Sequence, residues 1–163
     1  MAWASIARPP GDGPPVSRRT LMLIAIVLGI AAVANGCSPR YALRFETSGT
    51  PLTGPQAEQL ASSADISALA SVTTTDAVGM RAQVLADLRT RGELGQRAAD
   101  LLTAGFPENT AAVPVLVRAS TVDGIDALIV VEAFGGPGES LTHRRLWMFD
   151  RASGAVLRAA SFR

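Results

Sequence analysis

The chain has 163 residues, a formal net charge of +1, one cysteine and one histidine. A single thiol excludes an intramolecular disulfide and a cysteine-cluster metal site. A near-neutral chain also lacks the basic surface that nucleic acids require, so the sequence predicts no nucleic-acid partner. It likewise predicts no metal and no cofactor.

An apolar run of about fourteen residues, 21–34, follows a Pro- and Gly-rich lead. This length suits the hydrophobic region of a signal peptide and is short of the roughly twenty residues that span a membrane as a helix. Arg18 and Arg19 directly precede the run and provide the positive flank that orients an export signal. The sequence therefore predicts export of everything that follows.

The run ends in Ala34-Asn35-Gly36-Cys37, which resembles the lipobox of bacterial lipoproteins. Two positions depart from the usual pattern, because Ala34 stands where leucine is common and Asn35 is a less frequent occupant. The resemblance implies cleavage before Cys37 and a diacylglyceryl group on its thiol, and two acyl chains hold a protein stably on a membrane. The alternative is an uncleaved single-span anchor. Residues 17–22 also resemble a twin-arginine export motif, so general secretion and twin-arginine export both stay open.

These signals divide the chain into three parts. Residues 1–36 are predicted to be a signal peptide with a disordered lead, 37–55 a lipid-anchored tether, and 56–163 a small α+β domain. After cleavage, twelve basic and thirteen acidic residues remain, a net charge of −1. Within the tether, residues 41–46 alternate apolar with small or polar residues and predict one short strand.

Helical signals occupy the first half of the predicted domain. A weak helical pattern covers 56–69, and Thr74-Thr75-Asp76 is a helix-start signal. Apolar residues then recur at helical spacing on two stretches, broken near Arg91 by glycines. The first stripe comprises Ala77, Met80, Val84 and Leu88, and the second Leu94, Ala98, Leu101 and Leu102. Gly105 and Pro107 end the second stretch, which predicts a broken helix or a short helical hairpin.

Strand signals fill the second half. Residues 113–122 and 125–134 are rich in Val and Ile and flank Asp123-Gly124, a strong hairpin signal that pairs Val117 with Val130 and Val115 with Glu132. Residues 135–138 form a loop, and 143–150 with 155–162 form a second hairpin around 151–154. The predicted fold is α+β, with the helices packed on one face of a four-stranded antiparallel meander.

The segment from Phe149 to Val156 resembles a Phe-Asp-x-x-Ser/Thr-Gly-x-Val hairpin found in many secreted bacterial β-rich domains. Asp150 is expected to accept backbone hydrogen bonds within the turn, and Gly154 to take a positive φ. This resemblance predicts a turn and implies no function.

Candidate chemistry is sparse. His143 has no Gly-x-Ser-x-Gly elbow elsewhere in the chain to pair with and is interpreted as a strand-end surface residue. Asp123 and Asp126 are interpreted as turn residues, and Glu132 and Asp150 as solvated or turn-structural. The leading hypothesis is a non-enzymatic accessory lipoprotein, a binding or assembly module anchored to the outer side of the cell membrane. The alternatives are an envelope hydrolase using His143 and a carrier of a small apolar ligand.

One face of the second hairpin is the candidate partner surface. If Asp150 pairs with Ala155, Trp147 faces Arg158, and one side of the hairpin carries His143, Arg145, Trp147, Phe149, Arg158 and Phe162. Trp and Arg are enriched at binding hot spots. The alternative is that the rings lie beneath the 41–45 strand or the 60–69 segment, with the arginines reaching outward.

Overall fold

The computed structural model describes residues 43–106 and 110–163. The predicted lipidation residue Cys37 and the export residues Arg18 and Arg19 lie outside the described residues. The elements in chain order are β1 (Arg44–Glu46), α2 (Gly54–Ser62), a 3-10 turn η1 (Ser67–Leu69), α3 (Thr74–Arg89), α4 (Gly92–Gly105), β2 (Ala112–Val122), β3 (Ile125–Phe134), β4 (His143–Asp150) and β5 (Val156–Phe162). None of these helices is long and apolar enough to cross a membrane.

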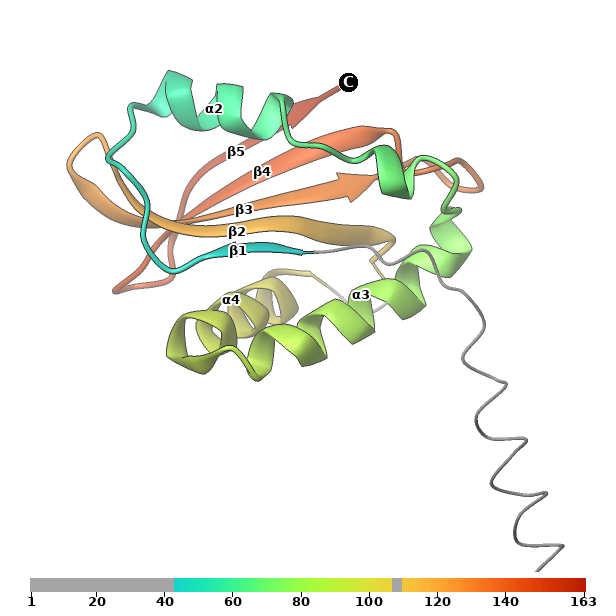
Figure 1. The fold of residues 1–163 in the computed structure, drawn as a ribbon, viewed down its shortest axis with the longest axis horizontal. Helices are drawn as coiled ribbons and strands as arrows, with labels where there is room; N and C mark the ends of the chain where they lie inside the picture. The colour runs from blue at the N-terminus through green and yellow to red at the C-terminus, as the bar shows by residue number, and fades with distance from the viewer. Residues whose placement is uncertain (1–42, 107–109) are drawn as a thin grey trace, which may run out of the picture. The chain divides into compact units, whose positions relative to one another are not determined.

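The sheet is mixed and has five strands in the order β1-β2-β3-β4-β5 (Figure 1). Strands β2 to β5 form the predicted antiparallel meander, but β1 adds to it in parallel, with Phe45 opposite Val117. The prediction of four strands was therefore incomplete. The short strand expected within residues 41–46 does form, as β1, but its pairing was missed because a parallel partner about 70 residues away in the sequence carries no hairpin signal.

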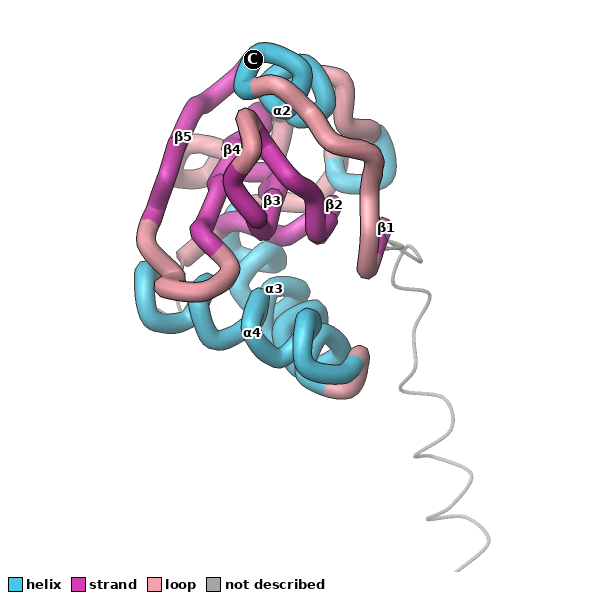
Figure 2. Tube along the Cα trace, turned by 90° about the vertical axis from the view of Figure 1, so that its left-hand side faces the viewer, coloured by secondary structure: helices cyan, strands magenta, loops and turns pink. Residues whose placement is uncertain are grey.

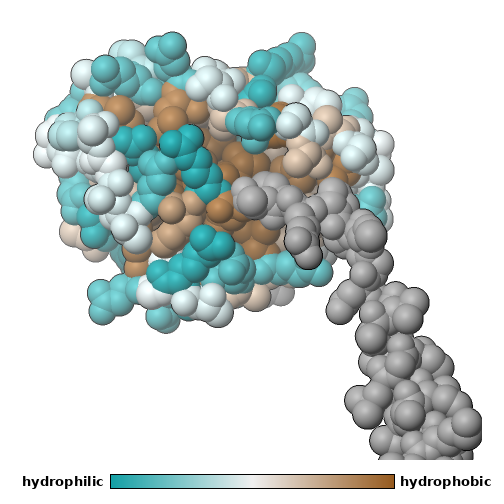
Figure 3. Space-filling model, viewed as in Figure 1, coloured by the Kyte–Doolittle hydropathy of each residue, from teal (hydrophilic) through white to brown (hydrophobic). Residues whose placement is uncertain are grey.

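Part of the predicted tether belongs to the folded domain. Leu52 forms a bridge with Val122, and Leu43, Phe45 and Leu52 pack against the core. Figure 3, which looks onto the β1 side of the sheet, shows apolar residues gathered across the middle of this face. The predicted boundary at residue 55 was therefore wrong, and the fold includes residues from Leu43 onward.

Helix α2 begins at a complete capping box. The hydroxyl of Thr53 accepts from the backbone N–H of Gln56, and the side chain of Gln56 accepts from the backbone N–H of Thr53. The carboxylate of Asp123, in the β2–β3 turn, accepts from the backbone N–H of Gly54 at 2.9 Å. Asp123 therefore ties the hairpin to the start of α2, in addition to its predicted turn role.

Helices α3 and α4 form the predicted helical hairpin. Thr73 caps α3 by accepting from the backbone N–H of Asp76, one residue earlier than the start signal indicated. Gly92 has a φ of +75°, a conformation that glycine adopts without a steric penalty, and it separates the two helices. The helix pair packs mainly on β2.

Helices cover both faces of the sheet, in three layers (Figures 1 and 2). Helix α2 lies on one face and contacts β4 and β5, whereas α3 and α4 lie on the other. The prediction that the helices share one face was wrong. Strands β2 and β3 are buried along most of their length because each is covered from both sides, which explains their nearly continuous runs of apolar residues.

The first hairpin follows the prediction at its turn and departs from it at its far end. Asp123 and Gly124 have φ values of 48° and 86°, as a two-residue turn with both central residues at positive φ requires. A register shift between Pro114 and Leu116 then places Glu132 opposite Pro114 instead of Val115. A bulge inserts one extra residue in one strand, and sequence alternation alone does not reveal it.

The second hairpin also contains a register shift, between Met148 and Phe149. The predicted turn is confirmed: Asp150 accepts from the backbone N–H of Ser153 at 2.6 Å, and Gly154 has a φ of +78°. Beyond the shift, Trp147 pairs with Ala159 instead of Arg158. Because one residue of slip turns every later side chain to the other face, Arg158 and Phe162 lie on the α2 side.

Candidate functional site

A buried carboxylate lies at the centre of the candidate site. Glu132, on β3, is fully buried, as are its neighbours Val131 and Ala133. The side chains of Glu132 and Val130 point to the same side of β3. Because Glu132 contacts Arg81 of α3, this side is the α3–α4 face of the sheet. A fully buried carboxylate is rare unless it is paired and hydrogen-bonded. The prediction of a solvated role for Glu132 was therefore wrong.

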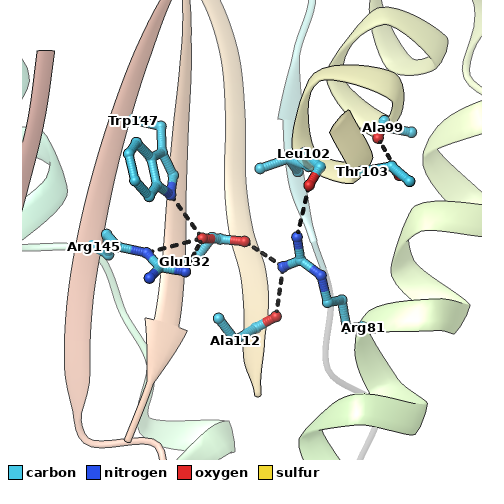
Figure 4. Close-up of polar contacts among 8 residues, drawn as sticks. All are labelled: Arg81, Ala99, Leu102, Thr103, Ala112, Glu132, Arg145 and Trp147. Atoms are coloured by element: carbon cyan, nitrogen blue, oxygen red, sulfur yellow. Dashed lines mark hydrogen bonds and ion pairs between the residues drawn. The ribbon is translucent and has the colours of Figure 1, made fainter. Parts of the chain in front are cut away.

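Arg81 of α3 provides the first partner. Its Nη1 donates to Oε1 of Glu132 and, at 2.9 Å, to the backbone carbonyl of Ala112, while Nη2 donates to the carbonyl of Leu102 at 3.2 Å (Figure 4). The Arg81 side chain is only 1% exposed. Because Leu102 lies in the last turn of α4, the guanidinium also meets the negative end of that helix dipole. Arg81 thus joins α3, α4 and the sheet.

Arg145 and Trp147, both on β4, hold the other carboxylate oxygen. Oε2 of Glu132 accepts from Arg145 Nη2 at 2.8 Å and Nε at 3.2 Å, and from the indole N–H of Trp147 at 2.8 Å (Figure 4). We call Glu132, Arg81, Arg145 and Trp147 the Glu132 cluster. Each member fixes another, so the side chains of Arg145 and Trp147 are held rigidly.

Aromatic rings surround the Arg145 guanidinium. Its Cζ lies 5.0 Å from the ring centroid of Trp147, 5.2 Å from that of Phe106 and 5.4 Å from that of Phe134, within the range of cation–π attraction. The rings of Phe106 and Trp147 are also in contact, with centroids 4.4 Å apart. Arg145 therefore has its stem and two of its donors fixed, while its side chain stays 21% exposed.

The cluster carries more positive than negative charge. It contains two guanidinium groups and one carboxylate, and Arg81 and Glu132 are closed off from solvent. The excess charge can therefore be reached only through Arg145. Guanidinium groups bind carboxylates and phosphates with directional hydrogen bonds, so this arrangement favours contact with an anion.

Within residues 43–106 and 110–163, the sheet face around Arg145 and Trp147 carries little helix cover beyond α4, which reaches the β4–β5 turn through Arg97. The cross-strand partners of these residues on β5 are Ser161 and Ala159, both small and exposed. The helix that contacts β4 and β5 is α2, on the opposite face, whereas α3 and α4 pack mainly on β2. We define the β4–β5 surface as Arg145, Trp147, Ala159 and Ser161.

The structure brings together only some of the predicted surface residues. Arg145 and Trp147 share the α3–α4 face with His143, whose ring lies 5.5 Å from that of Phe134. Arg158 lies on the other face and forms a 2.5 Å ion pair with Glu58 of α2. The ring that packs on Trp147 is that of Phe106, which follows α4, a residue that neither interpretation of this face had included.

The polar side chains considered for catalysis or metal binding have separate partners. The only polar partner of the His143 ring among the described residues is the Thr142 hydroxyl, 3.2 Å from Nδ1. Asp126 pairs with Arg151 at 3.0 Å, near the first turn. Within residues 43–106 and 110–163, no group of three or more His, Cys, Asp or Glu side chains is arranged to hold a metal ion.

Sequence reasoning missed Arg81 and Phe106 and gave Glu132 a solvated role. Arg81 falls four residues after Ala77 and four before Leu85, on the buried stripe of α3, but a stripe built only from apolar residues passes over it. Glu132 interrupts the apolar run of β3, and this was the available signal, since an acid in a doubly covered strand needs a buried cation. Phe106, just after α4, carried no such signal.

Comparison of the chain with protein-family models, with curated proteins and with solved structures finds no match.

Proposed function

We propose that this protein is an extracytoplasmic binding module, anchored to the cell membrane by a lipid on Cys37, which holds a partner on its β4–β5 surface. The lipobox-like segment before Cys37 supports the anchor. The observation that carries the binding role is the rigid placement of Arg145 and Trp147 on a sheet face with little helix cover. Preorganised Arg and Trp side chains lose little entropy on binding and are common hot spots.

The same geometry argues against a catalytic role for the cluster. Both oxygens of Glu132 already accept hydrogen bonds from cationic or indole donors, so the carboxylate is poorly placed to take a proton from a substrate. His143 lies at the start of β4 with a threonine hydroxyl as its neighbour. An assisting carboxylate, which a hydrolase of the serine–histidine type needs, is missing from the described contacts of His143.

Site-specific photocross-linking tests the binding role. A photoreactive amino acid replaces either Ser161, on the β4–β5 surface, or Gln59, an exposed residue of α2. Each variant of the full chain is expressed in the cells that normally make the protein. We expect a discrete cross-linked species from position 161 and none from position 59. Equal cross-linking at both positions, or none at either, contradicts the proposal. Mass spectrometry of the product identifies the partner.

A further inference from the structure

Strand β5 is an open edge of the sheet. It pairs with β4 on one side, and no other described strand pairs with its outer side. The strand has seven residues without Pro or Gly, and Val156 and Leu157 are 54% and 39% exposed. Proteins usually protect such edges with charges, proline, bulges or a covering element. In β5 the register shift at Leu157 and the charge of Arg158 lie in the first half of the strand, and the four residues from Ala159 to Phe162 carry neither protection, so this half can act as a template for an added strand.

The residues of β5 that face the α3–α4 side are small. Ala159 lies beside Trp147, and Ser161 lies beside Arg145. A strand added at the β5 edge would lie two strand spacings from β4, roughly 9.5 Å. Over a serine, a long side chain of that added strand can extend toward the guanidinium of Arg145, which Glu132 holds in place. The β4–β5 surface and the β5 edge thus form one continuous site.

The donors of Arg145 indicate the chemistry of the side chain that fits there. Glu132 binds the edge of the guanidinium formed by Nε and Nη2, and the second edge, formed by Nη1 and Nη2, can bind another carboxylate. An added carboxylate would also balance the two guanidinium charges of the Glu132 cluster. A basic side chain at this position would be repelled.

We propose that β5 accepts an extended segment of a partner protein as a sixth strand, and that an acidic side chain of this segment binds Arg145 across Ser161. A second copy of β5 fits less well, because residues 156–162 contain Arg158 and no acidic residue. This inference rests on the proposed function and narrows the partner to an acidic segment in β conformation.

A peptide titration of the full chain in detergent tests the inference. The probe is a fluorescein-labelled peptide, Thr-Val-Thr-Glu-Thr-Val-Thr, whose glutamate shares one face with the valines. The matched probes carry glutamine or lysine in place of the glutamate. We expect the glutamate peptide to bind about tenfold more tightly than the glutamine peptide, since a charge-assisted hydrogen bond is lost, and the lysine peptide to bind weakest. Equal affinities for the three peptides, or no binding of any, overturn the inference.

Two surface variants assign the effect to Arg145 without disturbing the buried cluster. In Ser161→Glu, a carboxylate of the chain itself reaches Arg145, so we expect the preference for the glutamate peptide to disappear. Gln59→Glu, which adds a carboxylate to α2 on the opposite face of the sheet, is the control and should keep the preference. If Ser161→Glu keeps it too, Arg145 is not the receptor and the inference fails.

Analytical ultracentrifugation tests the alternative that a second copy of the chain occupies the β5 edge. A dimer of the full chain that dissociates on Ala159→Lys substitution would show that a second copy occupies the edge, and this also overturns the inference. Because photocross-linking at position 161 detects any protein on the surface, a positive cross-link without peptide preference would sink the acidic-strand inference alone. The proposed function would then still stand.

Discussion

Replacing Glu132 by glutamine tests the energetic argument for the Glu132 cluster most sharply. The substitution keeps the shape of the side chain and removes the only negative charge of the cluster. Arg81, 1% exposed, then has no counter-charge, and its partners are neutral: the carbonyls of Ala112 and Leu102 and, where it still faces Arg81, the amide oxygen of the glutamine. The amide NH₂ that replaces one carboxylate oxygen also points a donor at other donors. Breaking a buried ion pair by removing one partner typically costs about 3–5 kcal/mol.

We therefore expect Glu132→Gln to lower the free energy of unfolding by about 3–5 kcal/mol, a large share of the roughly 5–15 kcal/mol typical of a domain. Urea unfolding followed by far-ultraviolet circular dichroism measures this loss. The control is Glu93→Gln, an exposed acid in the first turn of α4, which should change stability by no more than about 1 kcal/mol. A loss below about 1 kcal/mol for Glu132→Gln would refute the claim that the carboxylate holds the cluster together.

Three further predictions use the same preparation. Trp147→Phe should lower the free energy of unfolding by about 1.5–3 kcal/mol, because the hydrogen bond from the indole to the charged Glu132 is lost; an unchanged urea midpoint would show that this bond contributes nothing. The backbone N–H and then the hydroxyl of Ser153 hold the pKa of Asp150 below its usual 3.8, so this carboxylate stabilises the fold above pH 3.8 and the benefit is lost as the pH falls through the lower, folded-state pKa. Acid unfolding of Asp150→Asn should lack that component, and a profile identical to that of the parent chain would contradict it. Finally, the parent chain should incorporate labelled fatty acid and Cys37→Ala should not; failure of the parent chain to take up label would remove the lipid anchor from the account.

Local signals predicted the helices and both hairpins well. The Asp123-Gly124 turn, the start of α3 near Thr74 and the Asp150 turn each depend on a few neighbouring residues whose conformational preferences are strong. The same is true of the break between α3 and α4 at Gly92. Where the structure depends on adjacent residues, the sequence was sufficient.

Long-range features were missed for physical reasons. The parallel pairing of β1 with β2 involves residues about 70 positions apart, and the placement of α2 opposite α3 and α4 follows from tertiary packing. The two bulges changed strand register by one residue each, which moved Arg158 away from the candidate surface. Of the predicted surface, Arg145 and Trp147 remain together with His143 on one face, whereas the carboxylate that orients Arg145 and Trp147 was assigned to solvent.

Thiol accessibility in intact cells tests whether the domain lies outside the cytoplasm and whether a partner covers its β4–β5 surface. Because Cys37 is the sole cysteine and is predicted to be acylated, a cysteine introduced at an exposed position is the one thiol open to a membrane-impermeant maleimide. We expect Gln59→Cys to react in intact cells, whereas Ser161→Cys should be protected there and react once the protein is purified. Protection of both positions in intact cells would contradict the extracytoplasmic location, and equal reactivity of both would contradict an occupied β4–β5 surface.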